Sequence, residues 1–243
     1  MPSFDPFDLV RRRFAQELAR QEQRLVNIVL SVPGAVGDQA VAMTANLLAE
    51  SIALLGRLSH GAADAIVEAS RGPYARPLTP REVRLVREAY GDRVVPSRVR
   101  IVPGPGFSAI AAAAFIKGNP AITLGNTIFL KPGLSWLRPA ELPRTTGGLR
   151  MLVHEWTHVI QYATMGYAAF GARYVAELAA AGGNADRLYD YQTRHLTFTG
   201  ETLEGQAQIV GDLAGAVHGR TPADASRAQL LRSKLRGTGI YGQ

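Results

Sequence analysis

The 243-residue chain has no cysteine, and this absence narrows the choice of metal ligands. Without thiols there is no disulfide framework, and a metal site cannot use thiolate ligands. The absence says little about the compartment, because many secreted bacterial proteins also lack cysteine. Any metal ligands must therefore come from the five histidines and from the carboxylates.

Long uninterrupted apolar runs are also missing. The most apolar stretch, from about residue 41 to residue 58, contains Asn46, Glu50 and Arg57, so it is better explained as a buried helix than as a membrane span. The N-terminus has acidic residues and prolines before three arginines, and no apolar segment with a cleavage site follows. We therefore expect no transmembrane segment and no signal peptide, with synthesis in the cytoplasm and any export by a non-classical route.

Charged residues are few, at 19% of the chain, but their balance is basic, with a net charge of +7. Mild clusters occur at residues 11–13 and 232–236, without the interleaved aromatic residues of nucleic-acid-binding motifs. A turn at residues 103–106 lacks the lysine and the spacing of a phosphate-binding loop. The pattern indicates a solvated basic surface that aids solubility, and we expect no specific nucleic-acid partner.

Apolar periodicity predicts a mostly helical chain. Apolar residues make up 47% of the sequence, and those of residues 5–72 recur every three to four positions, which predicts two or three helices there. A capping threonine, a proline and a glutamate at residues 79–82 predict a helix that ends at Gly91. Further helices are expected from about Thr146 to a stop at Gly166, over about residues 170–180 and 202–217, and after a cap at Thr221.

β-Structure is expected only in the middle of the chain. Residues 94–102 alternate in polarity, and residues 121–130 contain two β-rich runs around Gly125 and Asn126, typical of a hairpin. The predicted fold class is α+β, mostly helical, with a small β-hairpin or sheet. We divide the chain into an N-terminal helical region at 1–76, a central domain at 77–220, and a C-terminal helix with a basic tail at 221–243.

The motif with the clearest chemistry is His-Glu-Trp-Thr-His at residues 154–158. Positions four apart differ by about 400° around a helix axis, so His154 and His158 lie one turn apart on one face. Their imidazoles can reach one ion at the roughly 2.0–2.1 Å of Zn–N bonds. Glu155 projects beside the ion, where it can accept a proton from bound water and pass it to a leaving amine. Chance can supply so short a motif, but this one lies in an amphipathic helix.

A catalytic zinc site needs a third protein ligand and an open fourth position. The metzincin continuation is missing, because the third and sixth residues after His158 are Gln161 and Thr164 instead of glycine and histidine. The third ligand of a gluzincin is a glutamate on a later helix. Glu204 is favoured, because Ala207 one turn further on would let the two helices approach closely.

Other residues remain alternatives to Glu204 or could support the site. Glu201 is equally explained by a helix N-terminus, and His195 by an exposed loop. Asp212 and Asp190 could orient the imidazoles. Tyr162 and Tyr191, with Tyr189 a further candidate, could bind a developing oxyanion. Each also has an ordinary explanation as a surface acid, a capping acid or a packed aromatic residue.

Four segments carry a resemblance to a known family: residues 78–91 with 99–102, residues 122–130, residues 152–162, and residues 204–212. The pattern His-Glu-x-x-His-Val-x-Gln is more specific than the bare motif. Over about residues 77–217 the chain resembles the zinc metallopeptidase domain of bacterial proteins associated with extracellular contractile injection systems. The first 72 residues and the tail after Arg220 lie outside the resemblance.

The resemblance implies a compact zincin-like metallopeptidase unit with an N-terminal helical extension. It implies that His154, His158 and Glu204 bind zinc and that Glu155 is the base. It also implies that residues 127–130 form the strand at the upper edge of the cleft, where an extended peptide could pair with the main chain.

These patterns favour a zinc-dependent peptidase with a peptide or protein substrate. By analogy with the family, the protein would be cargo or an accessory of an injection apparatus, whose components would be its partners. The alternative is a non-catalytic zincin-fold protein, with a structural metal or a cleft that binds a partner without cutting it. Glu155 favours the enzyme, because a structural metal site does not use a base.

Overall fold

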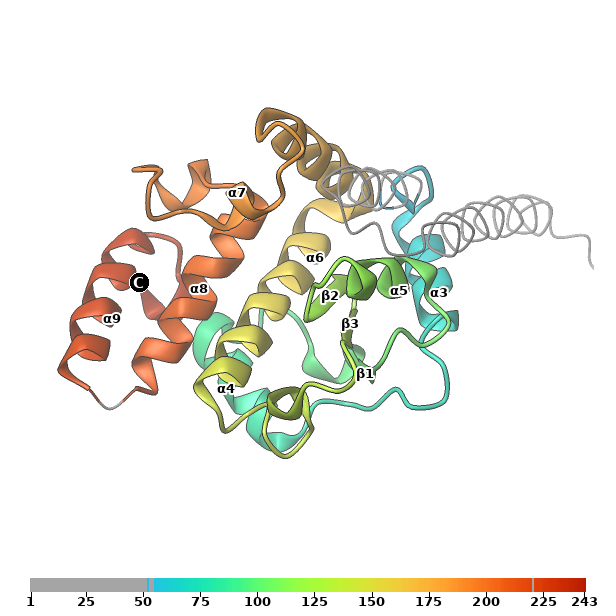
Figure 1. Ribbon diagram of the computed structural model, residues 1–243, viewed down its shortest axis with the longest axis horizontal. Coiled ribbons are helices and arrows are strands. Elements are labelled where there is room, and N and C mark those ends of the chain that lie inside the picture. Colours follow the sequence, from blue (N-terminus) through green and yellow to red (C-terminus); the bar gives the residue numbers. More distant parts are fainter. Residues whose placement is uncertain (1–51, 53–54, 220) are drawn as a thin grey trace, which may run out of the picture.

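The computed structural model describes residues 52, 55–219 and 221–243, and these form an α+β, mostly helical fold around a small sheet (Figure 1). The helices expected within residues 5–51, and with them most of the N-terminal helical region, lie outside the described residues. The helices are α3 (His60–Ala69), α4 (Pro80–Tyr90), α5 (Ala109–Ile116), α6 (Thr146–Ala180), α7 (Asp186–Tyr189), α8 (Leu203–Val217) and α9 (Pro222–Lys234). The strands are β1 (Arg100–Pro103), β2 (Ala121–Leu124) and β3 (Thr127–Leu130).

Helix α4 begins and ends where the sequence predicts. The Thr79 hydroxyl accepts from the Glu82 N–H at 3.3 Å, and the Glu82 carboxylate accepts from the Thr79 N–H at 2.7 Å. This capping box satisfies two amide groups that a helix start leaves unpaired. Gly91 follows the last turn with a φ of 60°. The predicted cap of the last helix is also confirmed, because Thr221 accepts from the Asp224 N–H at 3.1 Å.

The sheet has the strand order β1-β3-β2, and the predicted hairpin of β2 and β3 is confirmed. Gly125, at the first position of its two-residue turn, has a φ of 53°, a conformation that glycine adopts without steric cost. The resemblance implied that residues 127–130, which form β3, would be the strand at the upper edge of the cleft, and this prediction is wrong. β3 is central, parallel to β1 and antiparallel to β2, so its main-chain groups are paired on both sides. The strand at the edge of the sheet beside α6 is β2.

Helix α6 breaks at the predicted stop, Gly166, and its second half contains the helix predicted over about residues 170–180. Gly166 leaves helical geometry, with φ 76° and ψ 171°, but the helix resumes at once and reaches Ala180. In Figure 1 the second half of α6 runs in a different direction from the first half. Because of this kink, Phe170 and Tyr174 pack with Tyr162 in one apolar cluster. The alanine-rich helix α5 was not predicted, and residues 94–102 form a strand only from Arg100, after a short 3₁₀ turn.

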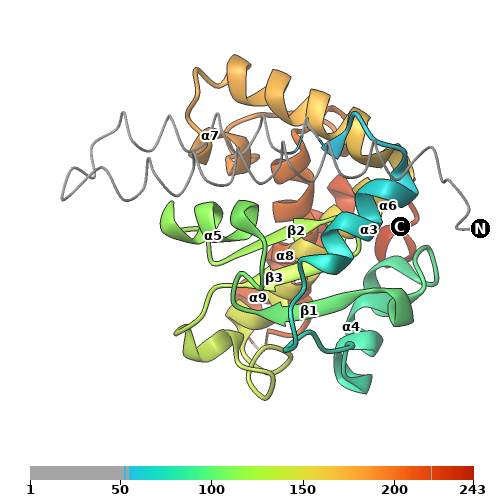
Figure 2. The ribbon, with the colours of Figure 1, turned by 90° about the vertical axis from the view of Figure 1, so that its right-hand side faces the viewer.

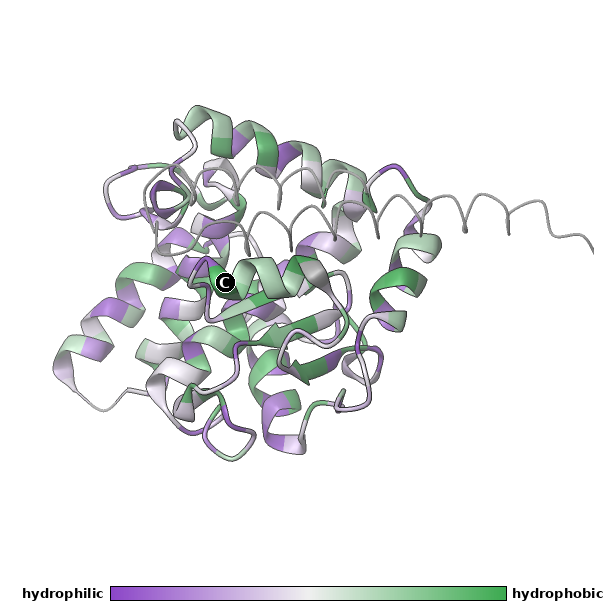
Figure 3. Cartoon of the chain, turned by 45° about the vertical axis from the view of Figure 1, so that its right-hand side comes forward, coloured by the Kyte–Doolittle hydropathy of each residue, from purple (hydrophilic) through white to green (hydrophobic). Residues whose placement is uncertain are grey.

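Helix α6 is the central element of the fold. It packs against β2 on one side and α8 on the other, and α9 covers the far side of α8 (Figures 1 and 2). The strands are mostly hydrophobic along their length, whereas hydrophilic residues alternate with hydrophobic ones on the surrounding helices (Figure 3). Among the described residues, none of the helices combines the length and apolar character needed to cross a membrane.

Helix α8 approaches α6 closely along a row of small residues spaced four apart: Ala207, Gly211 and Gly215. Ala207 is fully buried, as its predicted role requires. A Cβ atom on Gly211 would lie 2.7 Å from the carbonyl oxygen of Arg150 and 3.2 Å from the Cβ of His154. The row therefore sets the distance between the helix that carries the two histidines and the helix that carries Glu204.

Gly211→Ala should lower the free energy of unfolding by about 1–3 kcal/mol, because the new methyl group meets backbone that cannot move aside easily. Gly147→Ala is a matched control in α6, since its Cβ would meet only the Trp136 ring at 3.7 Å, an ordinary contact. Urea unfolding measures the free energy of unfolding of both variants, and the two values are compared. Equal stability of the two variants would show that the helices are not tightly apposed at Gly211.

Candidate metal centre

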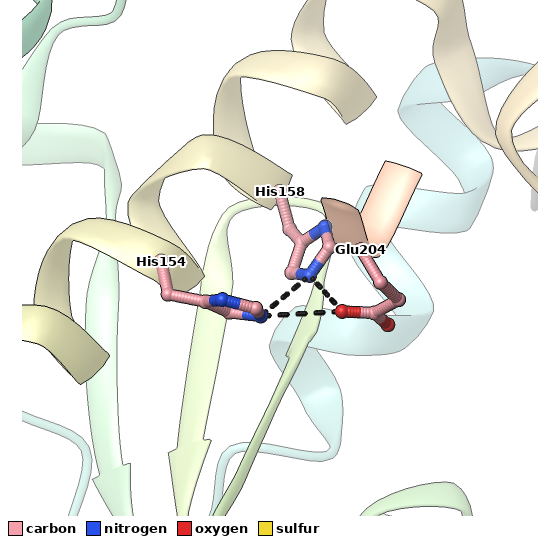
Figure 4. A group of neighbouring side chains, drawn as sticks. All are labelled: His154, His158 and Glu204. Carbon is pink, nitrogen blue, oxygen red and sulfur yellow. Dashed lines mark hydrogen bonds and ion pairs between the residues drawn. The ribbon is translucent and has the colours of Figure 1, made fainter. Parts of the chain in front are cut away.

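Three side chains from two helices meet at one point: His154 and His158 from α6, and Glu204 from the first turn of α8 (Figure 4). The Glu204 Oε2 atom lies 3.2 Å from the His154 Nε2 and 3.1 Å from the His158 Nε2, and the two nitrogens are 3.2 Å apart. Ligand atoms around a tetrahedral zinc ion are separated by about 3.3 Å, given bonds of roughly 2.0–2.1 Å. The three buried residues could therefore hold a metal ion.

The start of α8 is anchored by the second half of α6, and this brings Glu204 to the histidines. The Thr202 hydroxyl caps α8 by accepting from the Gly205 N–H at 2.9 Å. The Glu177 carboxylate accepts from the Leu203 N–H, also at 2.9 Å. A helix N-terminus that is fixed by side chains of α6 holds Glu204, two residues after the cap, in a defined place relative to α6.

The alternative third ligands lie elsewhere. The Glu201 carboxylate is buried and accepts from the Arg194 guanidinium at 2.9 Å. His195 is exposed in the loop before α8. Of the three candidates, Glu204 is the residue that the fold brings to the histidines.

The charged forms of the histidine and glutamate side chains in this cluster stabilise each other. Burial alone would lower the pKa of His158, but the Glu204 carboxylate, together with Glu155 and Gln161, outweighs burial and raises the pKa of His158 to about 9. Burial alone would raise the pKa of Glu204, but the two imidazoles, His158 foremost, hold the pKa of Glu204 well below its ordinary value. A buried anion is therefore balanced by a proton in the metal-free protein, and a divalent cation could take the place of that proton.

His158 is oriented by Gln161, a residue that we did not predict for this role. The His158 Nδ1 donates to the Gln161 side-chain oxygen at 2.7 Å, so its Nε2 faces Glu204. The Gln161 amide nitrogen donates in turn to the Leu203 carbonyl at 3.1 Å and to the Gln206 side chain at 3.0 Å. Such outer contacts fix which nitrogen of a histidine faces a metal. The sequence feature that could have indicated this role is the glutamine three residues after His158.

Asp212 and Tyr191 lie together in a different network, and so the structure does not bring them to the histidines. The Asp212 carboxylate accepts from the Tyr191 hydroxyl at 2.7 Å, from Arg227 at 2.6 Å, and from Arg150. Asp212 is eight residues after Glu204, which on a helix is about 12 Å along the axis and about 80° around it. The aspartate therefore joins α8 to α6 and α9. Asp190 pairs with Thr193 at 2.7 Å.

Tyr162 does lie beside the metal ligands. Its ring stacks on Phe170 with centroids 3.9 Å apart, and its buried hydroxyl has no hydrogen-bond partner within the described part of the chain. Burial raises the pKa of Tyr162 well above its ordinary value, so the hydroxyl stays protonated and can donate. Tyr189, rather than Tyr191, also lines this space, and its ring stacks on His154 with centroids 5.9 Å apart.

The ligands and Glu155 open onto a cavity of about 40 Å³. It is lined mainly by the three ligands, Glu155, four aromatic residues and two residues of β2, with Ile52 on one wall. A water molecule needs roughly 10–15 Å³ of cavity volume. This cavity therefore has room for small molecules but not for a peptide side chain of ordinary size. Peptide access would require lining side chains to move. Burial raises the pKa of Glu155, against the opposing effect of the imidazoles of His154 and His158.

Two imidazoles one helical turn apart, a glutamate from a second helix and an acid beside them form a candidate site of the His₂Glu class.

Comparison with known protein families shows that residues 79–166 match the model of the eCIS core domain. The match spans α4 to the kink of α6, and thus His154 and His158, but it ends before Glu204. It supports an association with contractile injection systems. No curated protein matches the chain by sequence.

Among solved structures, the chain is similar to the effector domain of Pseudomonas aeruginosa VgrG2b. The two share 22% sequence identity, with a TM-score of 0.49, over 76% of this chain and 95% of that one.

Proposed function

We propose that the protein is a zinc-dependent peptidase with its centre at His154, His158 and Glu204. The observation that carries this proposal is the convergence of two Nε2 atoms and one carboxylate oxygen at 3.1–3.2 Å from one another. Three protein ligands of the His₂Glu type, with a fourth position left for water, are typical of catalytic zinc rather than structural zinc. The adjacent Glu155 supplies an acid–base group that a structural site would not need.

When bound, zinc would supply a Lewis acid that polarises a peptide carbonyl and acidifies a coordinated water. The protein's own residues have separate roles around it. Glu155 accepts the proton of the attacking water and delivers it to the nitrogen of the leaving amine. The Tyr162 hydroxyl donates a hydrogen bond to the carbonyl oxygen as negative charge develops there. Gln161 keeps the His158 Nε2 directed into the site.

The edge of β2 offers a surface for an extended substrate. In the hairpin, the Pro120 carbonyl accepts from the Lys131 N–H at 2.8 Å. Since main-chain pairing alternates along an antiparallel strand, the main-chain groups of Ala121 and Thr123 face away from β3. Ile122 and Thr123 of β2 line the cavity beside the ligands. A peptide that paired with β2 would therefore pass next to the proposed metal.

The match of residues 79–166 to the eCIS core domain supports a second part of the proposal, that the peptidase is cargo or an accessory of an injection apparatus. Its substrate would then be a peptide or protein at the place of delivery. A non-catalytic protein that uses the same cleft for binding is the rival, and the cavity of about 40 Å³ would have to widen for either function. Metal content and cleavage, measured on the same sample, separate the two.

The purified full chain should contain one zinc per molecule by elemental analysis and should cleave members of a proteome-derived peptide library. Removal of zinc with 1,10-phenanthroline should abolish cleavage, and added zinc should restore it, because the ligands hold the group that activates water. Stoichiometric zinc without any cleavage would favour the binding protein. A chain that takes up no zinc would contradict both the enzyme and the metal site.

A further inference from the structure

The Thr123 side chain reaches from β2 to Glu155 on α6. Its Oγ1 donates to the Glu155 Oε2 at 2.7 Å and lies 3.2 Å from the backbone oxygen of the same residue. Thr123 is only 4% exposed and Glu155 is also 4% exposed, so water does not compete for this contact. Within the described part of the chain, no other side chain donates to the Glu155 carboxylate.

We propose that Thr123 is a positioning residue, which orients the Glu155 carboxylate for the reaction put forward above. This inference rests on the proposed function. With Oε2 held by the Thr123 hydroxyl, Oε1 is the oxygen left to accept the proton of the attacking water. One carboxylate oxygen is thus used for orientation and the other for proton transfer.

The location of Thr123 makes it suitable for this role. A threonine has few side-chain rotamers because it is branched at Cβ, and this one is held in a strand that pairs with the central β3. Its hydroxyl is therefore positioned from the sheet, on the side that faces α6. Groups held in advance by a rigid scaffold lower the cost of reaching the reactive geometry.

Thr123 also links the base to the proposed substrate edge. Its main-chain groups face away from β3, toward a peptide that pairs with β2, while its side chain holds Glu155. The same residue therefore contacts both the base and the strand edge at which a peptide would pair. In this way Thr123 links substrate alignment to proton transfer.

The test compares Thr123→Val, Thr123→Ser and the unchanged full chain, each loaded with zinc. The valine keeps the shape but removes the hydroxyl, and the serine keeps the hydroxyl. Thr123→Val should lower kcat by roughly 10- to 100-fold with KM nearly unchanged, since a small misplacement of a reacting group has this effect. Thr123→Ser should stay within about three-fold of the unchanged chain, on the same principle. Zinc content should be the same in all three.

A matched control is Thr127→Val, on the neighbouring strand. Thr127 is also a buried threonine, but its hydroxyl accepts from Arg71 at 2.8 Å and does not contact Glu155. If loss of kcat reflects general damage to the sheet, Thr127→Val will show it as well. If Thr123→Val unfolds, Thr123→Ala and Thr123→Ser make the same comparison of hydroxyl absent against hydroxyl present.

Two further measurements need no substrate: the affinity of acetohydroxamate for the zinc-loaded protein, and a crystal structure that locates the Glu155 carboxylate. Acetohydroxamate binds zinc and gives its acidic proton to a neighbouring base. Thr123→Val should weaken this binding and release the Glu155 carboxylate from its present position, whereas Thr123→Ser should do neither.

These outcomes separate the two proposals. If the unchanged chain cleaves no peptide, the proposed function fails, and the binding and crystallographic measurements still decide the role of Thr123. Equal kcat in Thr123→Val and the unchanged chain, or an unmoved Glu155 carboxylate in Thr123→Val, overturns the positioning role. Equal losses in the valine and serine variants would overturn it too.

Discussion

Replacing Glu155 with glutamine should lower peptide hydrolysis by roughly 10²- to 10⁴-fold while zinc stays bound, which is the usual contribution of a positioned acid–base group. Glutamine keeps the length of the side chain and can still accept from Thr123, but it cannot take up a proton. The Glu155 carboxylate is not among the groups that converge on the candidate metal position, so the ligand set is left intact. Elemental analysis and a discontinuous assay on the best library peptide measure both quantities in one preparation.

Two further variants serve as controls for this experiment. His158→Ala should lose zinc and turnover together, because it removes a ligand and the partner of the Glu204 charge. Glu141→Gln should change neither, since Glu141 is exposed and distant from the ligands in sequence. Full turnover in Glu155→Gln would end the catalytic interpretation of this residue, even if zinc were present.

Local patterns in the sequence predicted the parts of the fold that depend on neighbouring residues. The capping box at Thr79, the turn at Gly125 and the cap at Thr221 all formed as expected, because each is decided within about four residues. The same is true of His154 and His158, whose common face follows from helix geometry alone. Glu204 was favoured from Ala207, a sign of close helix packing, and the structure brings it to the histidines.

Features that depend on contacts between distant parts of the chain could not be predicted from local sequence patterns. The pairing of β1 with β3 joins segments that are separated by α5 and β2, and it determines that β2 is the edge strand. Asp212 shares a helix with Glu204, yet its direction around that helix brings it to Arg227 instead of a histidine. Thr123 carries no motif, and its contact with Glu155 exists only because α6 packs on β2.

Glu204→Gln should reduce zinc affinity by more than roughly 100-fold, since even the loss of an outer partner of a ligand costs 10- to 100-fold. Glutamine fits the same space but lacks the charge that balances the ion. Competition with a chromogenic chelator measures this change. Glu88→Gln is a matched control, because Glu88 pairs with His218 at 3.1 Å in a partly exposed His–Glu contact that has no third ligand among the described residues. If Glu204→Gln binds zinc as tightly as the unchanged chain does, the third ligand is another residue, and Glu201 and His195 are next to be tested.

The same variant should also change how the stability of the metal-free protein depends on pH. The folded pKa of His158, about 9, lies above its ordinary value of 6.5, so protonation of His158 stabilises the folded state fully below about pH 6.5. That contribution is lost as the pH rises through about 9. The Glu204 carboxylate is the main cause of the raised pKa, so Glu204→Gln should remove most of this loss. Urea unfolding at pH 6, 7.5 and 9 after chelation should show a fall in the unchanged chain and a flatter profile in the variant. Parallel profiles would mean that Glu204 does not hold the His158 proton.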